Sequence, residues 1–70
     1  MRMDKNIIRE NATNLWRLMN TSYKCYWKYS ELKEKMKLDD RELFTAIGWL
    51  ARENNIEIEY DLQIGEERYF

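Results

Sequence analysis

The sequence contains no histidine, no proline and a single cysteine, Cys25, in 70 residues. One cysteine excludes an internal disulfide, a dithiol redox pair and a cysteine-based zinc site. Without histidine the chain also lacks the commonest general base and metal ligand of enzymes. With only two glycines, Gly48 and Gly65, it contains no glycine-rich phosphate loop. We therefore expect a non-enzymatic protein with no catalytic residue, no metal site and no cofactor.

Long apolar runs are absent as well. The first eleven residues, MRMDKNIIREN, lack the apolar core of a signal peptide. Nothing approaches the roughly 20 apolar residues of a membrane-spanning helix. We expect a soluble protein of the reducing cytoplasm that does not contact a membrane. Residues 1–70 are short enough to form a single domain, with too little room for a ligand pocket of about 300 Å³ or more, so no small-molecule substrate is expected.

The most strongly patterned stretch is residues 39–54, which predicts one helix with a signal at each end. Asp39 is a good N-cap, and Glu42 three residues later completes a capping-box pattern. Leu43, Ile47 and Leu50 recur at helical spacing and predict the buried face. The helix ends at asparagines that tolerate a left-handed backbone, and residues 56–60 then alternate in the manner of a strand. A capped helix that turns sharply into a strand is typical of the third helix and wing of a winged helix-turn-helix domain.

The first half of the chain predicts a helix over residues 4–20, capped by Asp4 or Asn6, with Trp16 in the core or packed at its edge. A short strand is expected at residues 23–29, with every second side chain facing inward: Cys25, Trp27 and Tyr29. Its other face interleaves lysines with Tyr26. That face is typical either of an exposed edge strand protected by lysines or of a surface on which a nucleic-acid base stacks.

The remaining segments complete the predicted order. A second short helix is expected over residues 30–37, either with Ser30 as its cap or with a start one or two residues earlier. The second strand runs over residues 56–62, with three side chains expected to face inward: Ile56, Ile58 and Tyr60. Gly65 permits the hairpin to reverse, and residues 68–70 return as the third strand. The order helix, strand, helix, helix, strand, strand predicts a mostly helical α/β (α+β) winged helix-turn-helix fold.

The segment Ala46–Glu53, AIGWLARE, resembles a family of small stand-alone winged helix-turn-helix domains of uncharacterised function from bacteria and archaea. The run Leu15–Leu18 and the pair Glu31-Leu32 extend the resemblance over most of the chain. The sequence departs from that pattern at Asn54, where a glycine is expected, and in a hairpin, DLQIGEE, that is more apolar than a tight wing. The resemblance implies the winged-helix fold and no established activity.

Charge is divided unevenly along the chain. Residues 1–38 carry nine basic and four acidic side chains, a balance of +5. Residues 39–70 carry three basic and nine acidic side chains, a balance of −6, and the two halves together give the net charge of −1. Such a division is typical either of two solvated faces that happen to differ, or of a basic half that binds a polyanion or the acidic half of a second copy.

The first functional hypothesis is binding to double-stranded DNA in transcription regulation, with the helix at residues 39–54 in the major groove. Arg41 would read guanine and Thr45 a thymine methyl group, while nearby lysines hold phosphates. The predicted DNA-contacting residues are Lys24, Lys28, Lys33, Lys35, Lys37, Arg41, Thr45 and Arg52. Against this, residues 39–53 balance at −2 and residues 56–70 at −4, which repels phosphate.

The alternative hypothesis is a protein–protein interaction or homodimerisation module on the same scaffold, without DNA contact. Gly48 projects onto the outward face of the helix, where glycine costs about 1 kcal/mol relative to alanine. The neighbouring Trp49 is of the residue type most enriched at binding hot spots. Gly48 either makes room for Trp49 within the monomer or permits a second copy to approach. We expect Gly48 and Trp49 to mark the surface of self-association if a homodimer forms.

Overall fold

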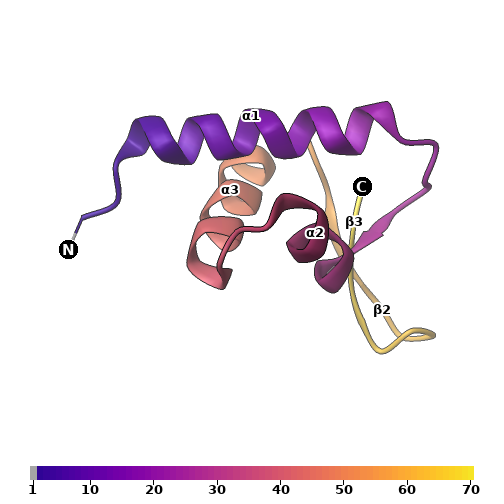
Figure 1. The fold of residues 1–70 in the computed structure, drawn as a ribbon. Helices are drawn as coiled ribbons and strands as arrows, with labels where there is room; N and C mark the ends of the chain where they lie inside the picture. The colour runs from indigo at the N-terminus through magenta and orange to yellow at the C-terminus, as the bar shows by residue number, and fades with distance from the viewer. Residues whose placement is uncertain (1) are drawn as a thin grey trace.

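The computed structural model, which describes residues 2–70, confirms the predicted order of elements and the fold class. Three helices and a three-stranded antiparallel sheet follow one another along the chain (Figure 1). Their bounds are α1 Lys5–Thr21, β1 Trp27–Lys28, α2 Tyr29–Met36, α3 Asp40–Arg52, β2 Ile58–Asp61 and β3 Glu66–Tyr69. The spatial order of the sheet is β1-β3-β2, so β3 is central and the other two strands are edges.

The core lies where α1 crosses α3 and where the inner part of the sheet closes against the helices. Figure 1 shows α1 above α2 and α3, with the β2–β3 hairpin projecting downward, away from α1. Most of the buried side chains come from α1, α2 and α3, and the sheet side adds three aromatic and aliphatic residues. The buried residues are Ala12, Leu15, Trp27, Leu32, Leu43, Ala46, Ile47, Leu50, Ile56 and Tyr69.

Local signals at the ends of α1 and α3 act as predicted. The Asp4 carboxylate accepts a hydrogen bond from the backbone N–H of Asn6 at 2.8 Å and caps α1. At α3 the capping box is complete: Asp39 accepts from the N–H of Glu42 at 2.8 Å, and Glu42 accepts from that of Asp39 at 3.2 Å. Asn54 adopts the left-handed conformation, with a φ of 59°. Each contact satisfies a backbone group or permits a turn that would otherwise cost free energy.

The predicted strand at residues 23–29 is wrong in extent. Only Trp27 and Lys28 are in a strand, since residues 23–26 lie in a loop and α2 begins at Tyr29. The Glu31 carboxylate accepts a hydrogen bond from the backbone N–H of Lys28 at 2.9 Å, which sets the first turn at Tyr29 rather than at the expected cap Ser30. Of the three side chains predicted to face inward, Trp27 is buried, Cys25 is exposed, and Tyr29 lies in the helix.

Trp16 is also not where the sequence placed it. It is 43% exposed, whereas Ala12 and Leu15 provide the buried face of α1. One residue advances about 100° around a helix, so Trp16 lies well off the stripe that runs through Leu15. The small residue Ala12 permits close approach of α3, and the core closes without the indole.

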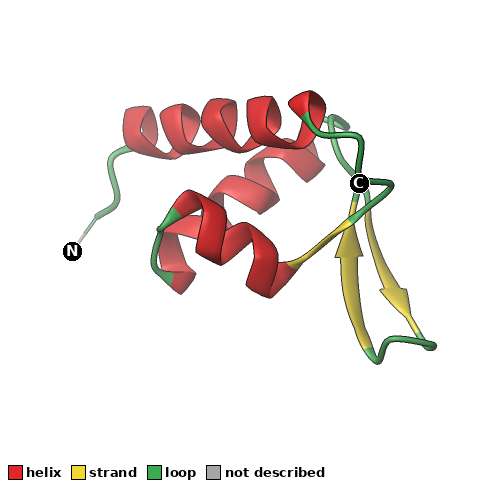
Figure 2. Cartoon of the chain, turned by 45° about the vertical axis from the view of Figure 1, so that its right-hand side comes forward, coloured by secondary structure: helices red, strands yellow, loops and turns green. Residues whose placement is uncertain are grey.

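The wing is less buried than predicted. Ile56 is buried, but Ile58 is 40% and Tyr60 58% exposed, so the expectation that all three face the core is wrong. The alternation itself holds, because Ile58 lies opposite the buried Tyr69 and directly paired residues face the same side of a sheet. The hairpin extends beyond the helices, as Figure 2 shows, and nothing there covers its inner face. The chain reverses over residues 62–65, and Gly65, which was expected to permit the reversal, has a left-handed φ of 71°.

Candidate nucleic-acid interface

The face of α3 that points away from the core is a row of mostly polar side chains. Arg41, Gly48 and Arg52 are exposed, and Thr45 is half-buried between them. The opposite face is held by four buried side chains: Leu43, Ala46, Ile47 and Leu50. Because α3 is fixed along its inner face, its outward row has a defined orientation for contact with a partner.

Phe44 belongs to this outward face, although the sequence analysis did not assign it there. It is 54% exposed and stacks on Tyr29 of α2, with ring centroids 4.6 Å apart. Position 44 is one step around the helix from the buried Leu43, which places it at the margin of the core. The Thr45 hydroxyl donates to the carbonyl of Glu42 at 2.9 Å, so its hydrogen is committed to the helix backbone. Phe44 and the Thr45 methyl group are both suited to contact a thymine methyl group.

Asp40, at the start of α3, joins the two helices of the helix-turn-helix. Its carboxylate accepts from the Tyr29 hydroxyl at 2.7 Å and from the Lys33 ammonium at 2.8 Å. These hydrogen bonds, first that of Lys33, lower the pKa of Asp40 below its usual value. Burial, and next the bond to Asp40, raises the pKa of Tyr29 to about 12. Lys33 therefore offsets one of the acidic charges at the end of α3 that would approach DNA.

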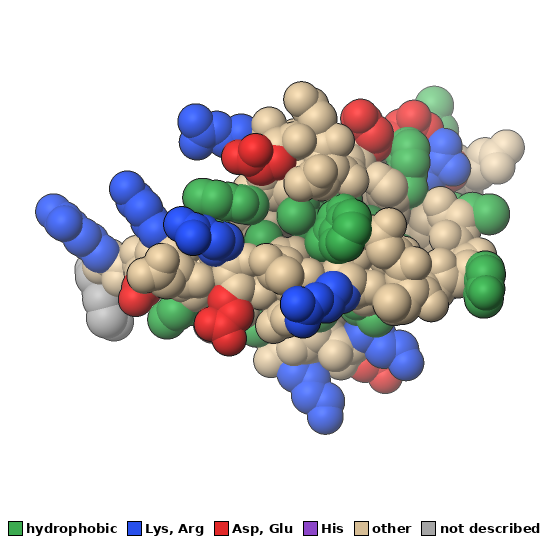
Figure 3. Space-filling model, turned by 90° about the horizontal axis from the view of Figure 1, so that it is seen from above, with side chains coloured by type: hydrophobic (Ala, Val, Ile, Leu, Met, Phe, Trp, Pro, Cys, Tyr) green, Lys and Arg blue, Asp and Glu red, His purple; other side chains and the backbone are tan. Residues whose placement is uncertain are grey.

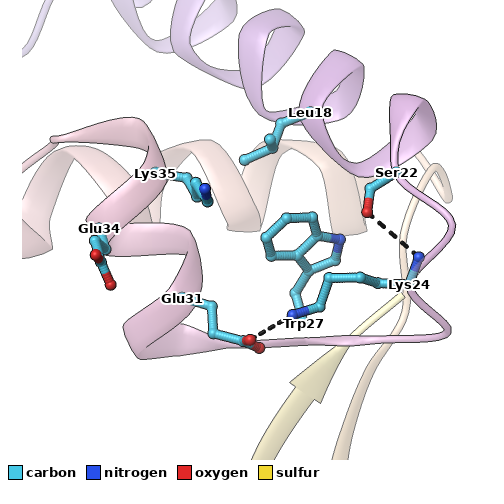
Figure 4. Close-up of a pocket in the computed structure, with 7 residues that line it drawn as sticks. All are labelled: Leu18, Ser22, Lys24, Trp27, Glu31, Glu34 and Lys35. Carbon is cyan, nitrogen blue, oxygen red and sulfur yellow. Dashed lines mark hydrogen bonds and ion pairs between the residues drawn. The ribbon is translucent and has the colours of Figure 1, made fainter.

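Lys24 is also engaged within the protein. Its ammonium forms an ion pair with Glu31 and lies 4.6 Å from the centre of the Trp27 ring (Figure 4). The hydrogen bond from Lys24, followed by that from the Lys28 backbone, lowers the pKa of Glu31. Of the five lysines predicted to hold phosphates, two are thus occupied by carboxylates.

The other three lysines are available. Among residues 2–70, Lys28, Lys35 and Lys37 form no ion pair. Lys35 and Lys37 are exposed at the end of α2, and Lys37 adopts a left-handed conformation with a φ of 55° that ends the helix. Of the unpaired cations, Lys35 therefore lies in the last turn of α2, and Lys37 lies in the turn that leads to α3.

A surface hollow of about 580 Å³ lies between α1, β1 and α2, which corrects the expectation that no such space exists. Figure 4 shows Leu18 and the Trp27 indole on its apolar side, with charged side chains from the loop before β1 and from α2 around them. Its lining residues are Leu18, Ser22, Lys24, Trp27, Glu31, Glu34 and Lys35. The hollow is wide open, and the contact of Lys24 with Glu31 crosses it. This geometry positions Lys24 inward rather than toward a partner.

The wing carries the opposite charge. Arg68 is its one cation between residues 56 and 70, against five acidic side chains. The guanidinium pairs with Glu59 at 2.5 Å and lies 3.9 Å from Asp61, and these carboxylates, Glu59 first, raise the pKa of Arg68. It also lies over the rings of Tyr26 and Phe70. The only wing cation is therefore already engaged by carboxylates and aromatic rings, and the wing presents a net negative surface.

A second basic surface covers α1. Its exposed cations include Arg9 and Arg17, and the segment before them adds Arg2 and Lys5. Figure 3, viewed onto α1, shows basic side chains spread over this face with apolar groups between them. The sequence analysis assigned these residues no role.

Comparison with known proteins identifies the fold and no relative of known activity. A family model described as a winged helix-turn-helix domain (DUF2582) matches residues 3–70. No curated protein and no solved structure matches the chain. Within residues 2–70 no helix has the length and apolar character needed to cross a membrane. The same residues hold no cluster of three or more side chains suited to a metal ion.

Proposed function

The chain belongs to the DUF2582 family of winged helix-turn-helix domains, and from that premise we propose that it binds double-stranded DNA. Family membership gives the fold, so the activity is inferred from the surface of this chain. On this proposal the protein is a non-enzymatic DNA-binding domain of transcription regulation that works in the cytoplasm. It needs no cofactor, because recognition rests on side chains alone.

The observation that carries the proposal is the outward row of α3 beside the unpaired lysines of α2. An α-helix fits the major groove, where arginine pairs with guanine and apolar groups contact thymine methyls. Arg41, Thr45 and Arg52 supply such groups, and Gly48 adds no bulk that would hold the helix away from the bases. Lys35 and Lys37 are free to contact phosphates on either side of the turn.

The salt dependence of DNA affinity tests this proposal. Each phosphate contact contributes about 0.9 to the slope of log affinity against log salt. Replacing Lys35 and Lys37 together by alanine should flatten the slope by about two, so the affinity should fall most at low salt. The matched control is Lys24→Ala, which also removes a positive charge. It should change the slope by less, because the Lys24 ammonium is already paired with Glu31. Fluorescence anisotropy with a mixed-sequence duplex at about 50 and about 200 mM salt gives both values. If the wild type shows no binding at low salt with tens of micromolar protein, the proposal fails.

A second candidate function, homodimerisation through the outward face of α3, is favoured by Gly48. A Cβ placed there meets no atom within 4 Å outside its two chain neighbours and the helix backbone, so no other part of the described monomer requires glycine at this position. Helix propensity alone favours alanine by about 1 kcal/mol. Close approach of another backbone, whether DNA or a second copy, supplies the missing reason for glycine. In a symmetric dimer, Trp49 of each copy would lie over Gly48 of the other.

Gly48→Leu separates the two candidates when compared with Gly48→Ala. Both variants should be at least as stable as the wild type, because the position is exposed and open. If the wild type is a dimer in sedimentation at micromolar concentration, Gly48→Leu should make it monomeric and Gly48→Ala should weaken it less. A wild type that sediments as a monomer, or a Gly48→Leu variant that dimerises equally well, contradicts the dimer.

A further inference from the structure

The outer edge of β2 has no strand partner among residues 2–70. In the order β1-β3-β2, this strand pairs with β3 along one side only. Glu57 and Phe70 exchange both of their backbone hydrogen bonds, at 2.7 and 3.1 Å. Bonded and non-bonded pairs alternate along an antiparallel ladder, so Ile58 and Tyr60 are non-bonded pairs with Tyr69 and Glu67. Their backbone N–H and C=O groups therefore point away from β3, toward the free edge.

The side chains along this edge form two rows of different chemistry. Ile58 and Tyr60 are 40% and 58% exposed and alternate with Glu57, Glu59 and Asp61, and Leu62, the first residue of the turn, is 88% exposed. Single exposed apolar residues are ordinary, but two alternating ones beside unpaired backbone groups, followed by a third at the turn, form a template for strand addition. The hairpin stands clear of the helices, so a further strand has access to the edge (Figure 2).

Charge decides which kind of chain the edge accepts. A second copy, paired antiparallel with the apolar rows on one side, places Glu59 opposite Glu59 and Glu57 opposite Asp61. Like charges directly opposite one another destabilise a pair of strands. Arg68 offsets part of the acidic charge, but residues 56–70 retain a balance of −4. A basic strand would instead place cations opposite this acidic row.

We propose that β2 is a docking edge for an extended segment of a partner protein in which lysine or arginine alternates with apolar residues. The segment adds a fourth strand to the sheet by pairing with the backbone of Ile58 and Tyr60. Its apolar side chains cover the exposed row, and its cations face Glu57, Glu59 and Asp61. Recognition of this kind derives its affinity from main-chain hydrogen bonds and its specificity from alternate side chains.

Tyr60→Pro tests the backbone part of the proposal. Proline removes an N–H that β3 does not use, and edge strands tolerate proline where that group faces solvent. The probe is a capped seven-residue peptide that alternates lysine and valine, and the control peptide has glutamate in place of lysine. In amide NMR spectra of the wild type, the lysine peptide should shift the signals of Ile58 and Tyr60 saturably. The glutamate peptide should bind at least ten-fold more weakly, and Tyr60→Pro should abolish binding of the lysine peptide.

A charge variant keeps the test decisive if Tyr60→Pro disturbs the hairpin. Glu57→Lys should lower the affinity for the lysine peptide about ten-fold. Glu34→Lys makes the same change of charge on α2 and should change that affinity by less than two-fold. Equal binding of the two peptides, equal effects of the two charge variants, or shifts confined to the helices would overturn the proposal. So would a wild-type dimer, formed without peptide, that Tyr60→Pro dissociates, because the occupant would then be a second copy.

Discussion

Two surfaces of this small protein carry opposite charge. One is the segment that leads into and forms α2, and the other is the wing. Residues 22–38 carry five lysines and two glutamates, a balance of +3, whereas residues 56–70 carry one arginine and five acids, a balance of −4. The helices also supply most of the buried apolar side chains, while the wing leaves Ile58, Tyr60 and Leu62 exposed. A single polyanion cannot be held by both surfaces. On the proposal of DNA binding, this difference places DNA at the helix-turn-helix and a different partner at the wing.

The largest expected contrast between the two regions is in stability. Leu50 is 4% exposed in the core, and Leu50→Ala should lower the free energy of unfolding by about 2–5 kcal/mol. Leu62 is 88% exposed in the wing, and Leu62→Ala should change it by no more than about 0.5 kcal/mol. Urea unfolding followed by tryptophan fluorescence measures both. Equal losses for the two leucines would mean that the wing is covered in solution and that the contrast is not real.

A smaller effect concerns the charge of the wing toward DNA. Replacing Glu66 and Glu67 by glutamine removes two like charges, so DNA affinity should rise a few-fold at low salt. Near 0.15 M salt, where the screening length is about 8 Å, the gain should nearly vanish if the wing stays away from phosphate. The same anisotropy titration measures the change. A large gain in DNA affinity that persists at this salt would place the wing against the DNA backbone. The wing and the helix-turn-helix would then belong to one DNA-binding surface.

The smallest effect is the response to pH of the contacts that join α2 to its neighbours. The pKa of Glu31 is lowered in the folded protein, so its contribution to stability is present above the ordinary value of 4.5 and is lost as the pH falls through the folded value. Tyr29 behaves in the opposite sense, because its pKa is raised from 10 to about 12 in the folded protein. Its contribution to stability is present below pH 10 and is lost as the pH rises from 10 through about 12.

Urea midpoints across pH check both directions of this response. Glu31→Gln should flatten the acid side of the profile without changing the alkaline side, and Tyr29→Phe should do the reverse. Profiles that remain parallel to the wild type would show that these two contacts do not contribute. Between pH 6 and 8 the chain has no histidine to titrate, so the midpoint should change little.

The sequence predicted α3 well because its signals are local. The cap at Asp39, the apolar spacing and the left-handed residue Asn54 act within a few residues of one another, and each is confirmed. The spacing left the start of α2 open by one or two residues, and the structure fixes it at Tyr29, where the Glu31 carboxylate accepts a hydrogen bond from the N–H of Lys28.

The wing and the candidate site were less predictable because they depend on tertiary distances. The alternation of Ile58 and Tyr60 gave the correct face of the strand, but only the fold shows that the hairpin extends beyond its covering helices. Likewise, all five lysines look equivalent in sequence. Folding brings Lys33 to Asp40 and leaves Lys37 unpaired, which changes the groups available to a phosphate.

Mapping the DNA-contacting surface by amide NMR tests the central claim most directly. We predict that a mixed-sequence duplex shifts the signals of α3 around Gly48 and of the turn at Lys35 and Lys37, while those of Ile58–Asp61 remain unchanged. Shifts centred on the wing, or on the basic face of α1 around Arg9 and Arg17, would contradict the assignment of DNA to the helix-turn-helix.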